Sequence, residues 1–146
     1  MNSTERLVSL CVATVGIALL LVGLVSGTPI RHVIQVIPVG IALFLGARRS
    51  PWAPAAALPL FVFWFFIMSL IWLWLLGLAR IVTGKFSPAE IGLTIVIGLG
   101  CAVGGVAALR CRTDRGGVQR AVAFMLFAGL QISAMWVSLQ RFIASR

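Results

Sequence analysis

Long apolar segments without charge constrain this chain more than any other feature. Five windows contain no Asp, Glu, Lys or Arg: residues 7–27, 32–47, 55–79, 91–109 and 121–140. About 20 helical residues cross the ~30 Å hydrocarbon core of a bilayer, and these runs lack the period-two alternation of barrel strands. We therefore expect an all-α integral membrane bundle, with residues 1–146 forming one transmembrane domain.

The overall composition supports a membrane protein and excludes a soluble globular domain. Hydrophobic residues make up 61% of the chain and charged residues 10%, against roughly 45–50% and about 25% in soluble domains. The net charge of +9 is also found in nucleic-acid binders, but here the cations lie in the gaps between apolar windows. There they meet anionic lipid headgroups, so membrane lipids are the expected partners and nucleic acid is not.

The second window is the shortest of the five. Its sixteen residues reach only about 24 Å as a helix. Arg31 and Arg48 flank it and can extend their side chains to the membrane surface, which allows a short helix to span. We expect five transmembrane helices; the alternative is four, with residues 32–47 re-entrant.

The Lys and Arg residues predict the orientation of the chain. With five spans, one side carries seven cations, which are Arg6, Arg48, Arg49, Arg110, Arg112, Arg115 and Arg120, and the other side carries five. The positive-inside rule then places the N-terminus in the cytoplasm and the C-terminus outside. With four spans the N-terminus moves outside and the C-terminus stays there, so only the N-terminal side depends on the alternative. Eleven of the twelve cations are Arg, which favours a bacterial inner membrane.

One local motif predicts where a helix begins. In Ser87-Pro88-Ala89-Glu90, Ser is a typical N-cap, Pro suits the first helical position, and Glu three residues after Ser completes a capping box. The fourth helix is therefore expected to start at Pro88, and Glu90 has a structural explanation.

Polar side chains within apolar windows are candidates for function, since they are costly in a bilayer. Those chosen as a candidate polar path are His32, Gln35, Gln131 and Ser138. His32 and Gln35 share a helical face with small residues, so this face should point into the bundle. The two glutamines either hydrogen-bond across a helix interface or line a shared cavity.

The fourth and third windows have opposite character. Gly100, Gly104 and Ala108 form a small-xxx-small ridge that favours tight helix packing, within the chain or between copies. The third window holds half of the aromatic residues, and we choose Trp64, Ser69 and Trp72 as a candidate apolar pocket. This helix either faces lipid or forms one wall of a pocket for a lipid-like ligand.

Catalytic and metal-binding patterns are absent from the sequence. All three acids lie outside the apolar windows, His32 is the only histidine, and no His, Cys and carboxylate residues have metal-ligand spacing. Acid–base chemistry needs a positioned titratable pair, so we expect neither an enzyme nor a metal site or cofactor.

Three functional hypotheses remain. The first is a non-enzymatic accessory or structural subunit that assembles, as a homo-oligomer or in a larger membrane complex, through the Gly-rich helix. The second is a small oligomeric transporter or channel for a neutral or weakly charged solute. The third is a binder of an apolar lipid-like ligand along the aromatic third helix.

Overall fold

The computed structural model describes residues 3–79, 86–111, 116–140 and 143, and their regular structure is entirely helical. The five long helices are α1 (Ser3–Val25), α2 (Pro29–Ala47), α3 (Ala53–Leu75), α4 (Pro88–Arg110) and α5 (Gly117–Ser138). Each is long and apolar enough to cross a membrane. The expected all-α bundle with five membrane-spanning helices is confirmed.

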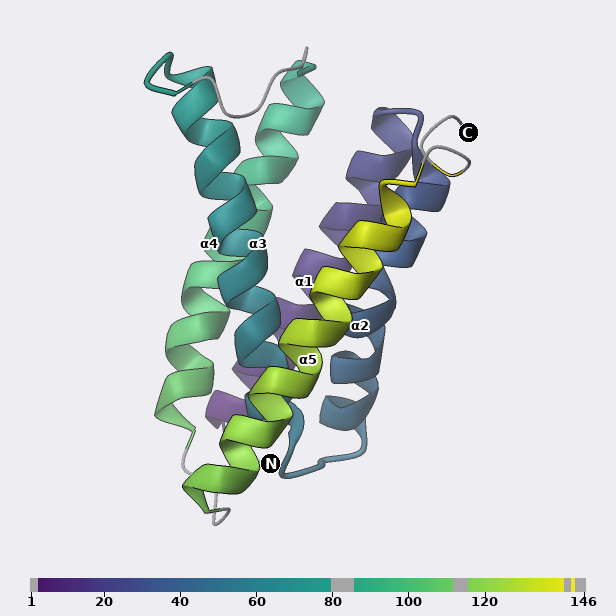
Figure 1. Cartoon of the computed structure of the whole chain (residues 1–146). Coiled ribbons are helices and arrows are strands. Elements are labelled where there is room, and N and C mark those ends of the chain that lie inside the picture. Colours follow the sequence, from purple (N-terminus) through teal and green to yellow (C-terminus); the bar gives the residue numbers. More distant parts are fainter. Residues whose placement is uncertain (1–2, 80–85, 112–115, 141–142, 144–146) are drawn as a thin grey trace.

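The helices run alternately up and down, and the two ends of the chain lie at opposite ends of the bundle (Figure 1). Neighbours in space form a closed ring in the order α1, α4, α3, α5, α2 and back to α1. α3 also contacts α1 and α2, so it touches all four other helices. The aromatic helix is therefore the central helix of the bundle, although one of its sides still faces outward.

The second apolar window forms part of an unbroken helix. α2 has 19 residues, which corresponds to about 28 Å, and it runs antiparallel to α1 along the bundle (Figure 1). The extra length comes from Pro29, Ile30 and Arg31, which precede the window. Pro29 occupies the first helical position, where a missing N–H costs nothing.

Glycine and capping residues set two helix ends that matter for the site. α3 stops at Leu75 and not at residue 79 because Gly77 adopts a φ of 73°. The Gly77 and Leu78 amides then donate to the carbonyls of Trp74 and Leu73, each at 2.9 Å, which is a Schellman motif. α4 begins at Pro88 with the predicted capping box.

The bundle is packed most closely toward the end that holds the N-terminus. There the core is built from small side chains, with Ala56 and Ala57 of α3 and Ala107 and Ala108 of α4 all buried. Small residues let helix backbones approach each other. Toward the opposite end, α3 and α4 diverge from α1, α2 and α5 (Figure 1).

Candidate functional site

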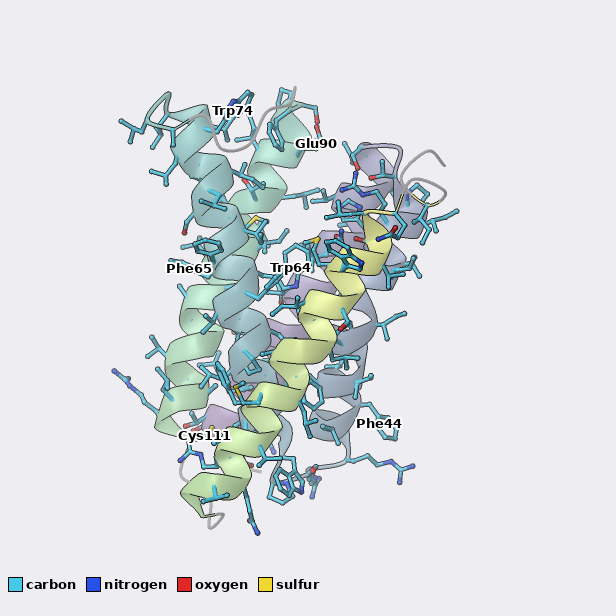
Figure 2. The ribbon with its side chains drawn as sticks, in the orientation of Figure 1. Phe44, Trp64, Phe65, Trp74, Glu90 and Cys111 are labelled. Carbon is cyan, nitrogen blue, oxygen red and sulfur yellow. The ribbon has the colours of Figure 1, made fainter. Side chains whose placement is uncertain are left out.

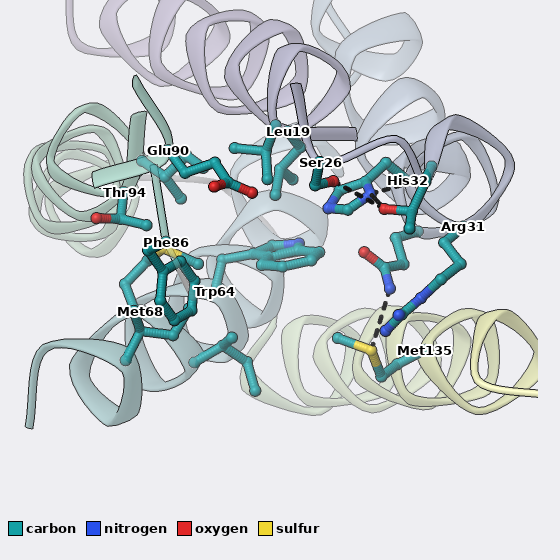
Figure 3. A pocket seen from close by; sticks show the side chains of 16 residues that line it. Leu19, Ser26, Arg31, His32, Trp64, Met68, Phe86, Glu90, Thr94 and Met135 are labelled. Carbon is teal, nitrogen blue, oxygen red and sulfur yellow. Dashed lines mark hydrogen bonds between the residues drawn. The ribbon is translucent and has the colours of Figure 1, made fainter. Parts of the chain in front are cut away.

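A cavity of about 360 Å³ lies where the helices diverge, at the end of the bundle that holds the C-terminus. Ligand pockets are typically about 300–1,000 Å³. Its lining comes from all five helices, and from Phe86 just before α4. Figure 3 shows it with a polar rim and an apolar interior.

The interior of the cavity is mainly apolar, and its buried polar residues are Gln35 and Thr94 together with the Trp64 indole. Its walls include Leu19 of α1, Ile67 and Met68 of α3 and Ile97 of α4. Trp64 lies among these side chains (Figure 3) and is only 3% exposed. Figure 2 shows Trp64 pointing into the bundle and its neighbour Phe65 pointing away from it.

The Trp64 indole lacks a hydrogen-bond acceptor. Its Nε1 atom is buried, and no acceptor among the described residues lies within hydrogen-bond distance. The indole is held in place by a T-shaped contact with Phe63, with 5.5 Å between ring centroids. A buried unsatisfied donor costs about 1–3 kcal/mol, so an oxygen atom brought into the cavity would be stabilised here.

The rim carries two side chains of opposite charge. Arg31 of α2 and Glu90 of α4 extend from opposing walls (Figure 3). Each is the third residue of its helix, and α2 and α4 run in the same direction. Both residues therefore lie within the first turn of their helices, at a similar depth in the bundle.

The hydrogen bonds of the two charged side chains differ. Glu90 Oε2 accepts from the Ser87 amide at 2.7 Å, as the capping box requires. Arg31 Nε is buried and has no hydrogen-bond partner. Within the described part of the chain, neither side chain forms an ion pair.

His32 closes the α1–α2 end of the rim. Its Nδ1 atom donates to the Thr28 carbonyl at 3.1 Å and lies 3.3 Å from the Thr28 hydroxyl. Gly23 allows this contact, since a Cβ there would lie 2.8 Å from the His32 Cγ atom. His32 is thus fixed by its own hairpin and presents the other edge of its ring to the cavity.

The four residues of the candidate polar path occupy two places. His32 and Gln35 line the cavity, whereas Gln131 and Ser138 are fully buried between α5 and α2 and are not part of its lining. Gln35 Nε2 donates to Ser138 Oγ at 2.8 Å, and Gln131 Nε2 donates to the Gln35 backbone carbonyl at 3.3 Å. Three of the four residues therefore join two helices, and Gln131 Oε1 has no partner.

The small-residue ridge of α4 contacts other helices of the same chain. A Cβ at Gly100 would lie 3.0 Å from Val15 of α1, and one at Gly104 would overlap the Phe61 ring of α3. Ala108 is buried in the same core. The ridge is therefore covered within the chain and is not available to a second copy.

The structure does not bring Trp64, Ser69 and Trp72 together. Trp64 lines the inner cavity, whereas Ser69 lines a groove of about 550 Å³ on the outer surface between α3 and α4. The Ser69 hydroxyl donates to the Phe65 carbonyl at 2.8 Å, so it is not the partner of the Trp64 indole. Trp72 lies about two turns from Trp64 along α3, within one turn of Ser69, and is partly exposed.

From the sequence, Arg31 and Glu90 were expected to have only structural roles, as a flanking cation and a helix cap. One signal could have revealed them. Thr28-Pro29-Ile30-Arg31 and Ser87-Pro88-Ala89-Glu90 share the pattern Ser or Thr, Pro, any residue, charged residue. Because both motifs start even-numbered helices of an up-and-down bundle, they must lie at the same end. Across the described residues, no three His, Cys, Asp or Glu side chains form a group that could hold a metal.

The function of this site has to be inferred from its own geometry and chemistry. Comparison with known protein families, with curated proteins and with solved structures finds no match to this chain.

Proposed function

We propose that this protein binds an amphipathic, lipid-like ligand in the cavity between its diverging helices. One observation carries the proposal: the cavity combines an apolar interior, a buried Trp64 indole without an acceptor, and a charged rim. This pattern suits a molecule with an apolar body, an oxygen atom for the indole and a polar head at the membrane surface. The proposal assigns no reaction to the site.

This proposal keeps the ligand-binding hypothesis and changes its location. The ligand lies on the inner side of α3, against Trp64, and not along the aromatic outer side. The accessory-subunit hypothesis is less favoured because the ridge on which it rested packs against Val15 and Phe61. The transporter hypothesis is less favoured because Gln131 and Ser138 are sealed within the α2–α5 contact.

The proposal includes a location and an orientation. We place the chain in a bacterial inner membrane with its C-terminus outside the cytoplasm, as the distribution of cations favours. The cavity lies at the same end of the bundle as the C-terminal end of α5 (Figure 1). Its rim then opens toward the outer surface of this membrane. Any homo-oligomer or larger complex would form through a surface other than the α4 ridge.

Fluorescence quenching tests the binding proposal directly. In a variant that keeps Trp64 and replaces Trp52, Trp72, Trp74 and Trp136 by Phe, the indole reports on the cavity. We expect saturable quenching when a diacylglycerol with brominated acyl chains is titrated into the protein in a non-ionic detergent. Bromine quenches an indole only at short range, so saturation measures occupancy next to Trp64.

Two comparisons make this test specific. A variant that keeps only Trp136, which is 71% exposed on α5, should show quenching that rises with probe concentration without saturating. Thr94→Phe fills the cavity wall and should abolish the saturable component in the Trp64 reporter. Ile95→Phe, on the exposed side of the same helix, should leave it unchanged. Non-saturating quenching of Trp64 in the unfilled protein would overturn the proposal.

A further inference from the structure

The two helix starts at the rim of the cavity have the same sequence pattern but different chemistry. At Ser87, the hydroxyl accepts from the Glu90 amide at 3.3 Å, and the Glu90 side chain returns a bond to the Ser87 amide. This closes the first turn of α4. At Thr28, no side chain caps α2: the Thr28 hydroxyl lies against Ser26 and His32 instead. Arg31, at the position equivalent to Glu90, cannot return a bond to the Thr28 amide, because a guanidinium has no acceptor.

The Arg31 side of the rim is suited to an anionic group. The first turn of α2 lacks a side-chain cap, and free amides at a helix start attract negative charge. The Arg31 side chain extends across the cavity toward Met135 of α5 (Figure 3), and its buried Nε has no partner among the described residues. The Thr28 hydroxyl is already paired with Ser26 at 2.8 Å, so an external acceptor is needed to satisfy the arginine.

The Glu90 side of the rim is suited to a cationic group. One carboxylate oxygen, Oε2, is used by the capping box, and no described residue donates to the other. Glu90 is half-buried and lines the cavity. A carboxylate in such a place is stabilised by a donor that carries positive charge.

We propose that the ligand of this cavity has a zwitterionic head group, with its phosphate bound by Arg31 and its ammonium bound by Glu90. This inference rests on the proposed function and specifies the class of its ligand. Arg31 and Glu90 line the same cavity from two different helices, so a head group seated there has a cationic partner on one side and an anionic partner on the other. The buried Trp64 donor and the apolar walls below receive the ester oxygens and the acyl chains. A phosphoethanolamine lipid has this chemistry.

A series of three brominated lipids with identical acyl chains tests the inference on the Trp64 reporter. Phosphatidylethanolamine carries both charges, phosphatidylglycerol carries only the phosphate, and diacylglycerol carries neither. We expect phosphatidylethanolamine to bind about tenfold more tightly than phosphatidylglycerol, and phosphatidylglycerol to bind more tightly than diacylglycerol, since each step removes one charge-assisted contact.

Three substitutions assign each charge to its partner. Glu90→Gln retains the capping box, because a Gln side chain can accept from the Ser87 amide, and it should remove the preference for phosphatidylethanolamine over phosphatidylglycerol. Arg31→Gln should remove the preference for phosphatidylglycerol over diacylglycerol. Arg110→Gln makes the same charge change at the opposite end of the bundle and should alter neither preference.

The outcomes separate this inference from the proposed function. Saturable quenching with equal affinity for all three lipids, or with phosphatidylglycerol as the tightest, would refute the zwitterionic head group and leave ligand binding intact. Absence of saturable quenching with every lipid would refute both. If a substitution at Arg31 or Glu90 prevents folding, the three-lipid comparison on the Trp64 reporter with both residues intact still tests the zwitterionic head group.

Discussion

At the scale of single residues, Gly104 shows how the bundle achieves its close packing. The Phe61 ring of α3 is 2% exposed and lies against the Gly104 backbone. The neighbouring Gly105 has ordinary clearance, because a Cβ there would lie 3.8 Å from the Phe61 Cβ atom. A methyl group therefore fits at Gly105 without displacing Phe61, whereas at Gly104 it does not.

We expect Gly104→Ala and Gly105→Ala to have different effects. The new methyl at Gly104 meets a buried ring, so the free energy of unfolding should fall by about 1–2 kcal/mol, even after the higher helix propensity of Ala is included. At Gly105 it should stay unchanged or rise by up to about 1 kcal/mol. Thermal unfolding in detergent measures both changes. An equal effect of the two substitutions would show that Phe61 does not restrict Gly104.

At the scale of helices, α2 and α5 are joined by polar contacts in an apolar setting. Gln35 donates to Ser138 Oγ at 2.8 Å and to the Met135 sulfur at 3.4 Å. Gln131 makes one bond, to the Gln35 carbonyl, and its own buried Oε1 is unsatisfied. The two glutamines therefore contribute unequally to the same interface.

Replacing each glutamine by Leu should reveal this difference. Gln35→Leu removes two contacts between helices, and we expect a loss of about 0.6–1.7 kcal/mol, the range found for hydrogen bonds between membrane helices. Gln131→Leu removes one bond together with an unsatisfied buried oxygen, so the stability should change little or increase. Denaturant titration of the purified protein compares the two. A larger loss for Gln131→Leu would show that its oxygen has a partner in the membrane.

At the scale of the whole molecule, the charges of the two ends differ. Among the described residues, Arg6, Arg48, Arg49, Arg110 and Arg120 lie toward the end that holds the N-terminus, and only Arg31 lies toward the other. Arg48 also contacts the Phe44 ring, with its guanidinium carbon 5.1 Å from the ring centre. Over the full sequence the five-span topology assigns seven cations to the N-terminal side and five to the other, so the cavity lies at the end with fewer cations.

The orientation can be measured with reporter fusions. Alkaline phosphatase fused to the C-terminus should be active, since the enzyme folds only outside the cytoplasm, and a green fluorescent protein in the same place should be dark. Phosphatase fused after Arg110, beyond the fourth helix, should be inactive because the proposed orientation places that end of the bundle in the cytoplasm. An active fusion after Arg110 together with an inactive one at the C-terminus would reverse the orientation and place the cavity rim inside.

The elements of this protein could be predicted well from its sequence because each is governed by local rules. Uncharged apolar runs indicated five helices, and the Ser87–Glu90 motif indicated the start of α4 at Pro88. The end of α3 was predicted less well, because Gly77 stops the helix inside an apolar run that continues to residue 79. Apolarity alone does not show where a backbone adopts positive φ.

The candidate site could be predicted only in separate pieces. His32, Gln35 and Trp64 were each chosen from the sequence, but they were assigned to two different hypotheses. The sequence alone determined that the chain is a helical membrane bundle and that few polar groups lie within it, because hydropathy acts on each segment independently. Only the tertiary structure decided that α3 is central, that the α4 ridge is covered by Val15 and Phe61, and that Arg31 and Glu90 line one cavity. These features depend on which helices are neighbours, and that is determined by the fit of side chains between helices far apart in the sequence.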